Sequence, residues 1–231
     1  MRNILKEKPI FALYGRFLES MNFVSDNDIK NKEILDIGCG FGWCEVNCLQ
    51  RGVKKITGIE ISRELLEETK DFFKDKRAHF EIADGLNLRF QNNSFDTVFC
   101  WEIIEHIPKN SENKMFKEVN RVLKKDGTFY LSTQYDLFLA KIFDPAWWLI
   151  GHRHYSFKQL EKFGKNNSLK VVDYRIKGRW WFILFILNMY FAKWVFKRKP
   201  FLEKLFIKKI NKEFKNPKGL TNIFVKFKKS G

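Results

Sequence analysis

Short apolar runs alternate with amphipathic runs along most of the chain. The first apolar run, Ile34, Leu35 and Ile37, is typical of a parallel strand buried on both faces. Amphipathic runs with apolar residues at helical spacing predict helices between such strands. This alternation predicts an α/β fold with a doubly wound, mostly parallel sheet. We expect strands over 34–37, 54–61, 78–83, 96–100, 128–133 and 169–177, and helices over 44–51, 62–74, 112–123 and 157–165.

A glycine-rich turn follows the first predicted strand. Asp36 closes the apolar run, and Gly38, Gly40 and Gly42 follow at alternate positions. Glycines permit positive φ angles and keep Cβ atoms away from a ligand, so this strand, turn and helix predict a nucleotide-like ligand. A P-loop would need Gly-Lys-Ser/Thr, which is missing here. A dinucleotide turn would need a small residue where the chain has Trp43.

An acid at the end of the second predicted strand fits the same ligand. Glu60 lies about 20 residues beyond the glycines, where a carboxylate can accept hydrogen bonds from both hydroxyls of a ribose. The alternative is a solvent-exposed acid at a strand end.

The spacing Asp-x-Gly-x-Gly-x-Gly from Asp36 to Gly42 resembles the first motif of the class I, Rossmann-like, S-adenosylmethionine-dependent methyltransferases. Residues 95–107 resemble the fourth-strand motif of the small-molecule branch of this family, the methyltransferase domain 11-like type. The resemblance covers residues 30–178 and 220–230 and implies S-adenosyl-L-methionine as cofactor. It also implies a seventh strand, over 221–229, that enters the sheet antiparallel beside the sixth.

The resemblance assigns the cofactor contacts to neighbouring strand ends. In this family an acid after the third strand accepts from the adenine amino group, and Asp84 holds that position. An Asx turn before Gly85 is its alternative role. The position after the fourth strand faces the methyl group. The expected cofactor-binding residues are Asp36, Gly38, Cys39, Gly40, Gly42, Glu60, Ile61, Asp84, Gly85 and Trp101.

One candidate base follows the fourth predicted strand. His106 is suited to general-base chemistry because the pKa of an imidazole lies near neutrality. Glu105 would orient His106 or bind the acceptor. The alternative is a purely structural acid–His pair, which the family often has at this place.

A second cluster lies in residues 134–156, which we expect to be an irregular loop of the length that is usually functional. His154 is the second candidate base, with His152 close by, and Arg153 is suited to hold an anionic group of the acceptor bidentately. The alternative is a surface cluster that packs on Trp147.

Two classes of nucleic-acid methyltransferase are disfavoured by the residues after the fourth strand. Amino-methyltransferases of nucleic acids carry Asn/Asp-Pro-Pro-aromatic there, whereas this chain has Cys100, Trp101, Glu102 and Ile103. The Pro-Cys nucleophile of cytosine-5 enzymes is also missing, because Cys100 follows Phe99.

The net charge of +16 is concentrated near the C-terminus of the 231-residue chain. Residues 175–231 contain 16 Lys/Arg and two acids, Glu203 and Glu213, so they carry +14 of the total. Such an excess predicts an anionic partner. Four cysteines form no metal-ligand spacing, no metal is expected, and the chain start has no signal peptide, so we expect free thiols in the cytoplasm.

The most hydrophobic run, 180–196, has 17 residues and contains Asn188 and Lys193, whereas a spanning helix needs about 20 apolar residues. Residues 200–215 are amphipathic and basic. Apolar faces edged by Lys and Arg are typical of helices that lie in a bilayer interface. If the chain returns to the sheet afterwards, a single crossing is topologically forbidden. A pair of helices that caps the protein's own core and a dimer interface are the alternatives.

The sequence therefore predicts a methyltransferase that O-methylates a small or lipid-linked acceptor at a membrane surface, peripheral on its inner face, with membrane contact through 180–215. A nucleic-acid methyltransferase that uses the basic C-terminal region and a catalytically silent S-adenosylmethionine-binding scaffold remain open. The expected domains are an N-terminal helical cap, in which Phe11, Tyr14 and Phe17 can cover the cofactor, the core, a hydrophobic and basic helical insert, and the last strand. Their bounds are 1–30, 31–178, 179–218 and 219–231.

Overall fold

A computed structural model describes residues 12–230 of the chain, and the predicted contact of Phe11 lies outside them. One seven-stranded sheet has the order β3-β2-β1-β4-β5-β7-β6. The strands from β1 to β5 pair in parallel, and β7 lies antiparallel between β5 and β6, which confirms the predicted sheet. The strands are β1 (Glu33–Ile37), β2 (Lys55–Glu60), β3 (Ala78–Ile82), β4 (Phe95–Trp101), β5 (Leu123–Gln134), β6 (Leu169–Lys177) and β7 (Asn222–Lys229).

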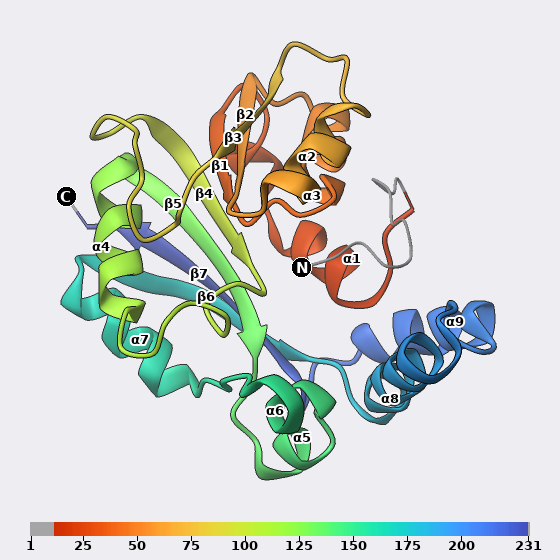
Figure 1. The fold of residues 1–231 in the computed structure, drawn as a ribbon. Coiled ribbons are helices and arrows are strands. Elements are labelled where there is room, and N and C mark those ends of the chain that lie inside the picture. Colours follow the sequence, from red (N-terminus) through yellow and green to blue (C-terminus); the bar gives the residue numbers. More distant parts are fainter. Residues whose placement is uncertain (1–11, 231) are drawn as a thin grey trace.

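Helices cover both faces of this sheet, as Figure 1 shows. A 3-10 turn, η1 (Asp26–Asp28), follows the first helix. The helices are α1 (Gly15–Phe23), α2 (Trp43–Gln50), α3 (Arg63–Lys70), α4 (Glu112–Val122), α5 (Phe138–Ile142), α6 (Pro145–Ile150), α7 (Phe157–Asn166), α8 (Trp180–Phe196) and α9 (Glu203–Phe214).

Two hydrophobic cores lie on opposite faces of the sheet. The first core packs α4 and α7 against the sheet through residues such as Phe116 and Leu160, both fully buried. The second core joins α1, α2, α8 and α9, where Phe23, Cys44 and Phe214 are buried. All four cysteines are free and buried. The apolar runs of the strands are therefore enclosed from both sides, as their composition predicts.

Residues 134–156 are not simply irregular, because they contain the short helices α5 and α6. Local chemistry explains α6: the side chain of Asp144 accepts the N–H of Ala146 at 3.0 Å, and Pro145 occupies the first turn. Gly151 ends the helix with a φ of +68°. Helices of five and six residues are too short to show an amphipathic period.

The hydrophobic and basic segment forms α8 and α9, two helices in contact with each other. Within residues 12–230, no helix combines the length and the hydrophobicity that a membrane crossing requires. Phe182, Phe185, Ile210 and Phe214 of this pair are buried in the second core. The pair thus caps the protein's own core with one side, and other large apolar residues of α8 remain exposed.

Candidate active site

The three glycines of the turn after β1 all have positive φ angles, of +78° at Gly38, +52° at Gly40 and +74° at Gly42. A Cβ on Gly38 would collide with Ile103, and one on Gly42 with Phe73. A Cβ on Gly40 would meet no atom within 4 Å. The outer glycines thus allow close packing, whereas the middle one faces open space, as the cradle of a ligand requires.

Glu60 lies directly beside this turn. The N–H groups of Gly38 and Cys39 donate to the carbonyl of Ile59, at 2.8 and 3.0 Å, which ties the turn to the end of β2. Oε1 of Glu60 accepts the N–H groups of Ile61 and Ser62, at 2.9 and 3.1 Å. These bonds hold the carboxylate in one place and use only one of its two oxygens. Because Glu60 is only partly buried, it is available to a ligand at the turn.

Asp84 and Gly85 extend the same edge of the sheet. The N–H of Ala83 donates to the carbonyl of Glu60 at 3.2 Å, and a Cβ on Gly85 would lie 2.8 Å from Ile37. Asp84 is exposed, and its Oδ1 accepts the N–H of Leu86 at 2.8 Å in an Asx turn. The turn fixes the carboxylate without burying it. Nearby, the apolar side chain of Ile61 is 72 % exposed.

Two carboxyl groups are buried beneath the turn. Asp36 of β1 is opposite Gly58 of β2, and a Cβ on Gly58 would lie 2.5 Å from Oε1 of Glu45. Glu45 is fully buried. Neither of its carboxyl oxygens has a hydrogen-bond partner in the described residues, and Oδ1 of Asp36 has none there either. Burial raises the pKa of both groups, so protonation of one relieves the charge repulsion.

The side chains of Cys39 and Trp101 point into the protein. Cys39 is 1 % exposed, so it offers a ligand only its backbone. Trp101 is 5 % exposed, and its ring stacks on Phe99 in the second core. Its Nε1 is buried without a partner in the part of the chain that the structure describes. Trp101 therefore supports the end of β4 from below.

Glu102, directly after β4, organises the next part of the edge. It has a φ of +57°, which is uncommon for a residue with a side chain. Its carboxylate accepts from Ser132 at 2.8 Å, from Gln134 at 2.8 Å and from Arg16 at 3.2 Å. Asn222 of β7 adds longer contacts. No local sequence signal marks Glu102, which joins α1, β4, β5 and β7.

Three of the four histidines form one chain of contacts with Asp144. Nε2 of His152 lies 3.2 Å from Nε2 of His106, and its Nδ1 lies 3.6 Å from Oδ2 of Asp144. Nε2 of His154 lies 2.9 Å from the same oxygen, and its Nδ1 faces the carbonyl of Tyr135 at 3.2 Å. His106 is accessible, whereas the side chain of His154 is only 1 % exposed. His154 thus holds Asp144, His106 is exposed, and His152, whose side chain is 12 % exposed, lies between His106 and Asp144.

The protonation states of His106 and Asp144 follow from the groups that surround them. Desolvation by the protein atoms around it, together with the adjoining His152, lowers the pKa of His106 to about 4. His106 is therefore neutral at pH 7 and can accept a proton. Burial opposes ionisation of Asp144, but hydrogen bonds from His152 and His154 hold the pKa of its carboxyl below the usual range. Asp144 therefore carries a negative charge beside His152.

Glu105 does not contact His106 through a hydrogen bond among the described residues. It is 4 % exposed, and its Oε2 accepts from Thr133 at 2.8 Å. Burial raises the pKa of Glu105 to about 8, with a further contribution from Glu102. The structure therefore places it as a mostly protonated group behind the β4 end.

Arg153 does not present its guanidinium to an acceptor, contrary to the expectation from sequence. It donates to Glu112 at 2.6 Å and to the carbonyl of Ile104 at 2.8 Å, and also to the carbonyl of Ile107. These partners use both ends of the guanidinium. Arg153 therefore ties the segment before α7 to the loop after β4.

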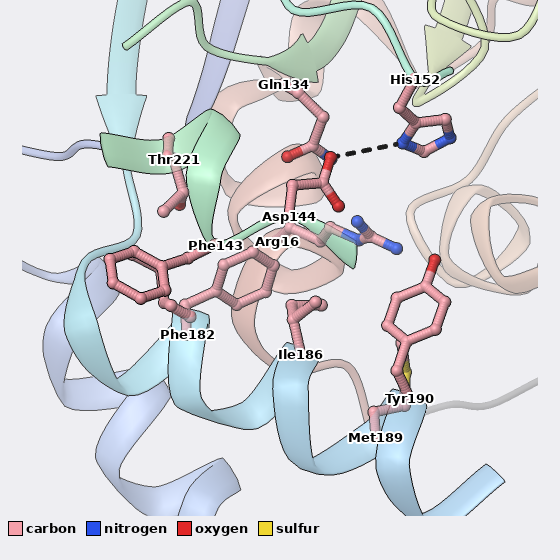
Figure 2. A pocket seen from close by; sticks show the side chains of 12 residues that line it. Arg16, Gln134, Phe143, Asp144, His152, Phe182, Ile186, Met189, Tyr190 and Thr221 are labelled. Atoms are coloured by element: carbon pink, nitrogen blue, oxygen red, sulfur yellow. Dashed lines mark ion pairs between the residues drawn. The ribbon is translucent and has the colours of Figure 1, made fainter. Parts of the chain in front are cut away.

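A pocket adjoins Glu102 and the histidine chain. Figure 2 shows polar side chains on one side, among them Gln134, Asp144 and His152, and side chains of α8 on the other. Since Gln134 and Arg16 bind Glu102, and His152 contacts His106, the pocket lies beside the β4 end. Its lining residues are Arg16, Gln134, Ala140, Phe143, Asp144, His152, Phe182, Ile183, Ile186, Met189, Tyr190 and Thr221.

Comparisons with known proteins match the part of the chain that carries the turn and the strand-end acids. The model of a family described as methyltransferase domain matches residues 34–127. Phosphoethanolamine N-methyltransferase 2 of Caenorhabditis elegans is 31 % identical over 157 residues, which are 66 % of this chain and 35 % of that protein. The ubiquinone biosynthesis O-methyltransferase of Pelagibacter ubique (strain HTCC1062) is 31 % identical over 111 residues, 47 % of this chain and 45 % of that protein.

The chain therefore spans less than half the length of each of these two curated relatives. Among solved structures, an S-adenosylmethionine-dependent methyltransferase from Mesorhizobium loti superimposes with a TM-score of 0.64 at 15 % identity. The superposition covers 91 % of this chain and 96 % of the other. The shared fold thus extends well beyond residues 34–127.

Proposed function

Because this chain belongs to the class I S-adenosylmethionine-dependent methyltransferases, we propose that it methylates an oxygen of a small or lipid-linked acceptor held in the pocket beside β4. The observation that carries the proposal is the position of this pocket. It lies at the sheet edge that also holds the glycine turn, and it touches Glu102 through Arg16 and Gln134. Ligands of doubly wound sheets bind beyond the carboxyl ends of the strands.

Four residues in and beside the turn fit the cofactor. Gly40 leaves room for a ligand against the backbone. Glu60 presents a carboxylate that suits a ribose diol, and Asp84 presents one that suits an adenine amino group. Oδ1 of Asp36, buried without a partner in the described residues, suits a cationic amino group. When bound there, S-adenosylmethionine supplies a methyl group that its sulfonium already activates.

The chain's own residues then hold the acceptor and remove its proton. Orientation of two reactants can supply roughly 7–11 kcal/mol of a barrier. The His106–His152 pair would accept the proton that a hydroxyl of the acceptor releases when its oxygen takes the methyl group; the bond from that methyl to the sulfonium sulfur would break and leave a neutral thioether. Asp144 stabilises the positive charge that the pair gains. A base of this kind favours an oxygen acceptor, because an amine attacks through a lone pair that is already free.

Contact with a membrane surface through residues 180–215 is part of the proposal. Residues 179–218 contain eleven Lys and Arg against two Glu, and α8 exposes large apolar residues. The same basic charge favours a second candidate, an RNA methyltransferase. RNA binding that falls steeply with salt, without affinity for vesicles, would favour that candidate.

Two measurements test the proposal. Calorimetry with S-adenosylmethionine is expected to give one site per chain, and no binding would overturn the cofactor assignment. Incubation with S-adenosylmethionine carrying a labelled methyl group and a cell lipid extract is expected to give labelled lipid. If the protein binds S-adenosylmethionine but transfers no labelled methyl group to lipid, RNA or small molecules, the result would favour the catalytically silent scaffold.

A further inference from the structure

Large apolar side chains are exposed on one side of α8. They recur at helical spacing and are between 37 and 60 % exposed. They are Trp180, Leu184, Leu187, Phe191, Trp194 and Val195. The other side of α8 buries Phe182 and Phe185 in the second core. The exposed stripe therefore takes no part in the second core.

A second exposed apolar group lies on α5 and α6. Its members are at least 43 % exposed, and they are Phe138, Leu139, Trp148, Leu149 and Ile150. The hairpin is held together locally, because the indole N–H of Trp148 donates to the carbonyl of Ile142 at 3.0 Å. Side chains as large as these are rarely exposed together on a protein surface without an interaction partner.

The two groups form one surface. The ring of Phe143, at the end of α5, contacts the ring of Trp180 edge to face, with centroids 6.2 Å apart. Helix α6 also contacts α8. Figure 1 shows α5, α6 and α8 at the same end of the molecule, in the lower part of the view. We call the exposed apolar residues of α5, α6 and α8 the docking surface.

Positive charge borders the docking surface. Lys197, Arg198 and Lys199 directly follow α8 and are exposed. Helix α9, which packs on α8, exposes further lysines, namely Lys204, Lys208, Lys209 and Lys212. Of the two acids in this segment, Glu213 is engaged by the main chain of α8. An apolar surface with this border matches a bilayer that contains anionic lipids.

The pocket lies where the two halves of the docking surface meet. Ala140 and Phe143 of the α5 segment line one wall, and Ile186 and Tyr190 of α8 line another. Phe143 both lines the pocket and is 39 % exposed at the surface. Figure 2 shows the polar groups Asp144 and His152 opposite the side chains of α8. An amphiphile would thus find apolar walls and a polar end.

We propose that α5–α6 and α8 together dock on an anionic lipid bilayer, and that the acceptor is an amphiphilic lipid that enters the pocket between them. The docking part stands on the surface alone, whereas the acceptor part rests on the proposed methyl transfer. The α5–α6 hairpin is the new element, since the hydrophobicity of residues 180–215 alone does not require it. Its tryptophans suit the bilayer interface, where aromatic residues are enriched.

Vesicle sedimentation tests the docking part. We expect wild type to bind phosphatidylcholine vesicles with phosphatidylglycerol at least tenfold more tightly than vesicles of phosphatidylcholine alone. The variant Leu149→Ser/Ile150→Ser removes apolar contact from the α6 half and keeps the Trp148 hydrogen bond, and Phe191→Ser/Trp194→Ser removes apolar contact from the α8 half. Each is expected to weaken binding to anionic vesicles at least tenfold. Val172→Ser on β6, which is 49 % exposed before substitution, is the matched control and should bind as wild type does.

Three results would overturn the docking proposal. Wild-type protein that does not bind anionic vesicles excludes the bilayer. Unchanged binding of Leu149→Ser/Ile150→Ser excludes the α5–α6 half. A concentration-dependent dimer in ultracentrifugation that both double variants abolish assigns the surface to a second copy of the chain. S-adenosylmethionine affinity, measured on every variant, verifies folding because the substituted residues lie outside the glycine turn.

The acceptor part has a separate readout. Labelled methyl transfer into lipid-extract vesicles is expected to fall at least tenfold in both double variants, while their affinity for S-adenosylmethionine stays unchanged. Vesicle binding by wild type without labelled lipid would overturn entry of a lipid acceptor but not docking. Failure to bind S-adenosylmethionine would instead overturn the proposed function.

Discussion

The carboxyl group of Glu45 lies directly over Gly58, so that a Cβ at position 58 would be 2.5 Å from its Oε1. Glycine at this position therefore makes room for a fully buried acid of α2 beneath the cofactor turn. Asp36 lies opposite Gly58 on the neighbouring strand. The two acids share one apolar environment, which has consequences for stability.

We predict that Glu45→Gln makes the protein more stable than wild type, by an amount that grows as the pH rises. Burial raises the pKa of Glu45 well above 4.5, so below that pH the folded and unfolded states are both protonated and no stability is lost. At higher pH the unfolded state loses its proton first, which lowers the free energy of unfolding by up to about 1.4 kcal/mol per pH unit. Glutamine does not titrate and removes this loss.

Thermal unfolding of wild type and Glu45→Gln between pH 4.5 and 8 measures the effect. The melting temperature of the variant should exceed that of wild type by an amount that grows with pH. Glu64→Gln, at an exposed position on α3, is the control and should show no such growth. A Glu45→Gln variant that is less stable than wild type at pH 8 would contradict the argument.

Substitution of Gly40 is expected to separate strain from ligand binding. Gly40→Ala places a side chain at a φ of +52°, which costs roughly 1–2 kcal/mol, and fills the space that the backbone leaves open. Gly52→Ala has a comparable φ, +77°, with its nearest neighbour 3.8 Å from the new Cβ, but lies away from the turn. Both variants should lose similar stability.

Only Gly40→Ala should lose affinity for S-adenosylmethionine, by at least tenfold in calorimetry. Gly52→Ala should bind as wild type does. Equal affinities of the two variants would mean that the open space at Gly40 is not part of the cofactor site.

The sheet and its turn were predictable because their signals are local. Apolar runs bounded by Asp84-Gly85 or by Gly38 and its neighbours mark strand ends without any knowledge of the fold. Glu60 follows from the same logic, since the carboxyl ends of parallel strands meet at one edge, whereas the role of Asp84 was implied by the resemblance to the methyltransferase family. The predicted antiparallel strand over 221–229 corresponds to β7, one residue shorter at its start.

The pocket and the partners of its polar groups were not predictable because they depend on contacts between distant parts of the chain. Glu102 receives hydrogen bonds from Arg16, 86 residues away, and from Asn222, 120 residues away. Arg153 was expected to face an acceptor, but it forms an ion pair with Glu112, 41 residues earlier in the chain. Along 180–196 almost every residue is apolar, so hydrophobicity alone does not distinguish the buried face of α8 from the exposed one.

The attachment of α8 to the protein depends on an acid of α9. Glu213 accepts the N–H groups of Arg179, Trp181 and Phe182 at 2.7, 2.8 and 3.1 Å. These donors belong to the first turn of α8, where no side chain of the helix itself provides a cap. We predict that Glu213→Ala lowers the free energy of unfolding by about 2 kcal/mol.

Urea unfolding measures this loss, and Glu213→Gln, which keeps an acceptor oxygen, should recover part of it. Glu161→Ala, at an exposed position on α7, is the control and should change stability little. If Glu213→Ala were as stable as wild type, α8 would not depend on this cap.

His106 offers the sharpest test of the proposed chemistry. If the His106–His152 pair accepts the proton of the acceptor, His106→Asn should lower the rate of labelled methyl transfer by about 10²–10⁴-fold. Its affinity for S-adenosylmethionine should stay unchanged, because His106 is not one of the cofactor contacts. His79→Asn changes an exposed histidine on β3 and is the matched control. Both variants replace a histidine with asparagine, but at different ends of the sheet.

The pH dependence follows from the lowered pKa of His106. A base must be unprotonated to act, and with a pKa of about 4 the imidazole is neutral throughout the range from pH 6 to 8. The wild-type rate should therefore be flat over this range as far as His106 is concerned, and should fall only as the pH approaches 4. A rate that already halves near pH 6.5 would assign the base to a group with an ordinary imidazole pKa. Full activity of His106→Asn would remove His106 from the mechanism, whatever the pH profile.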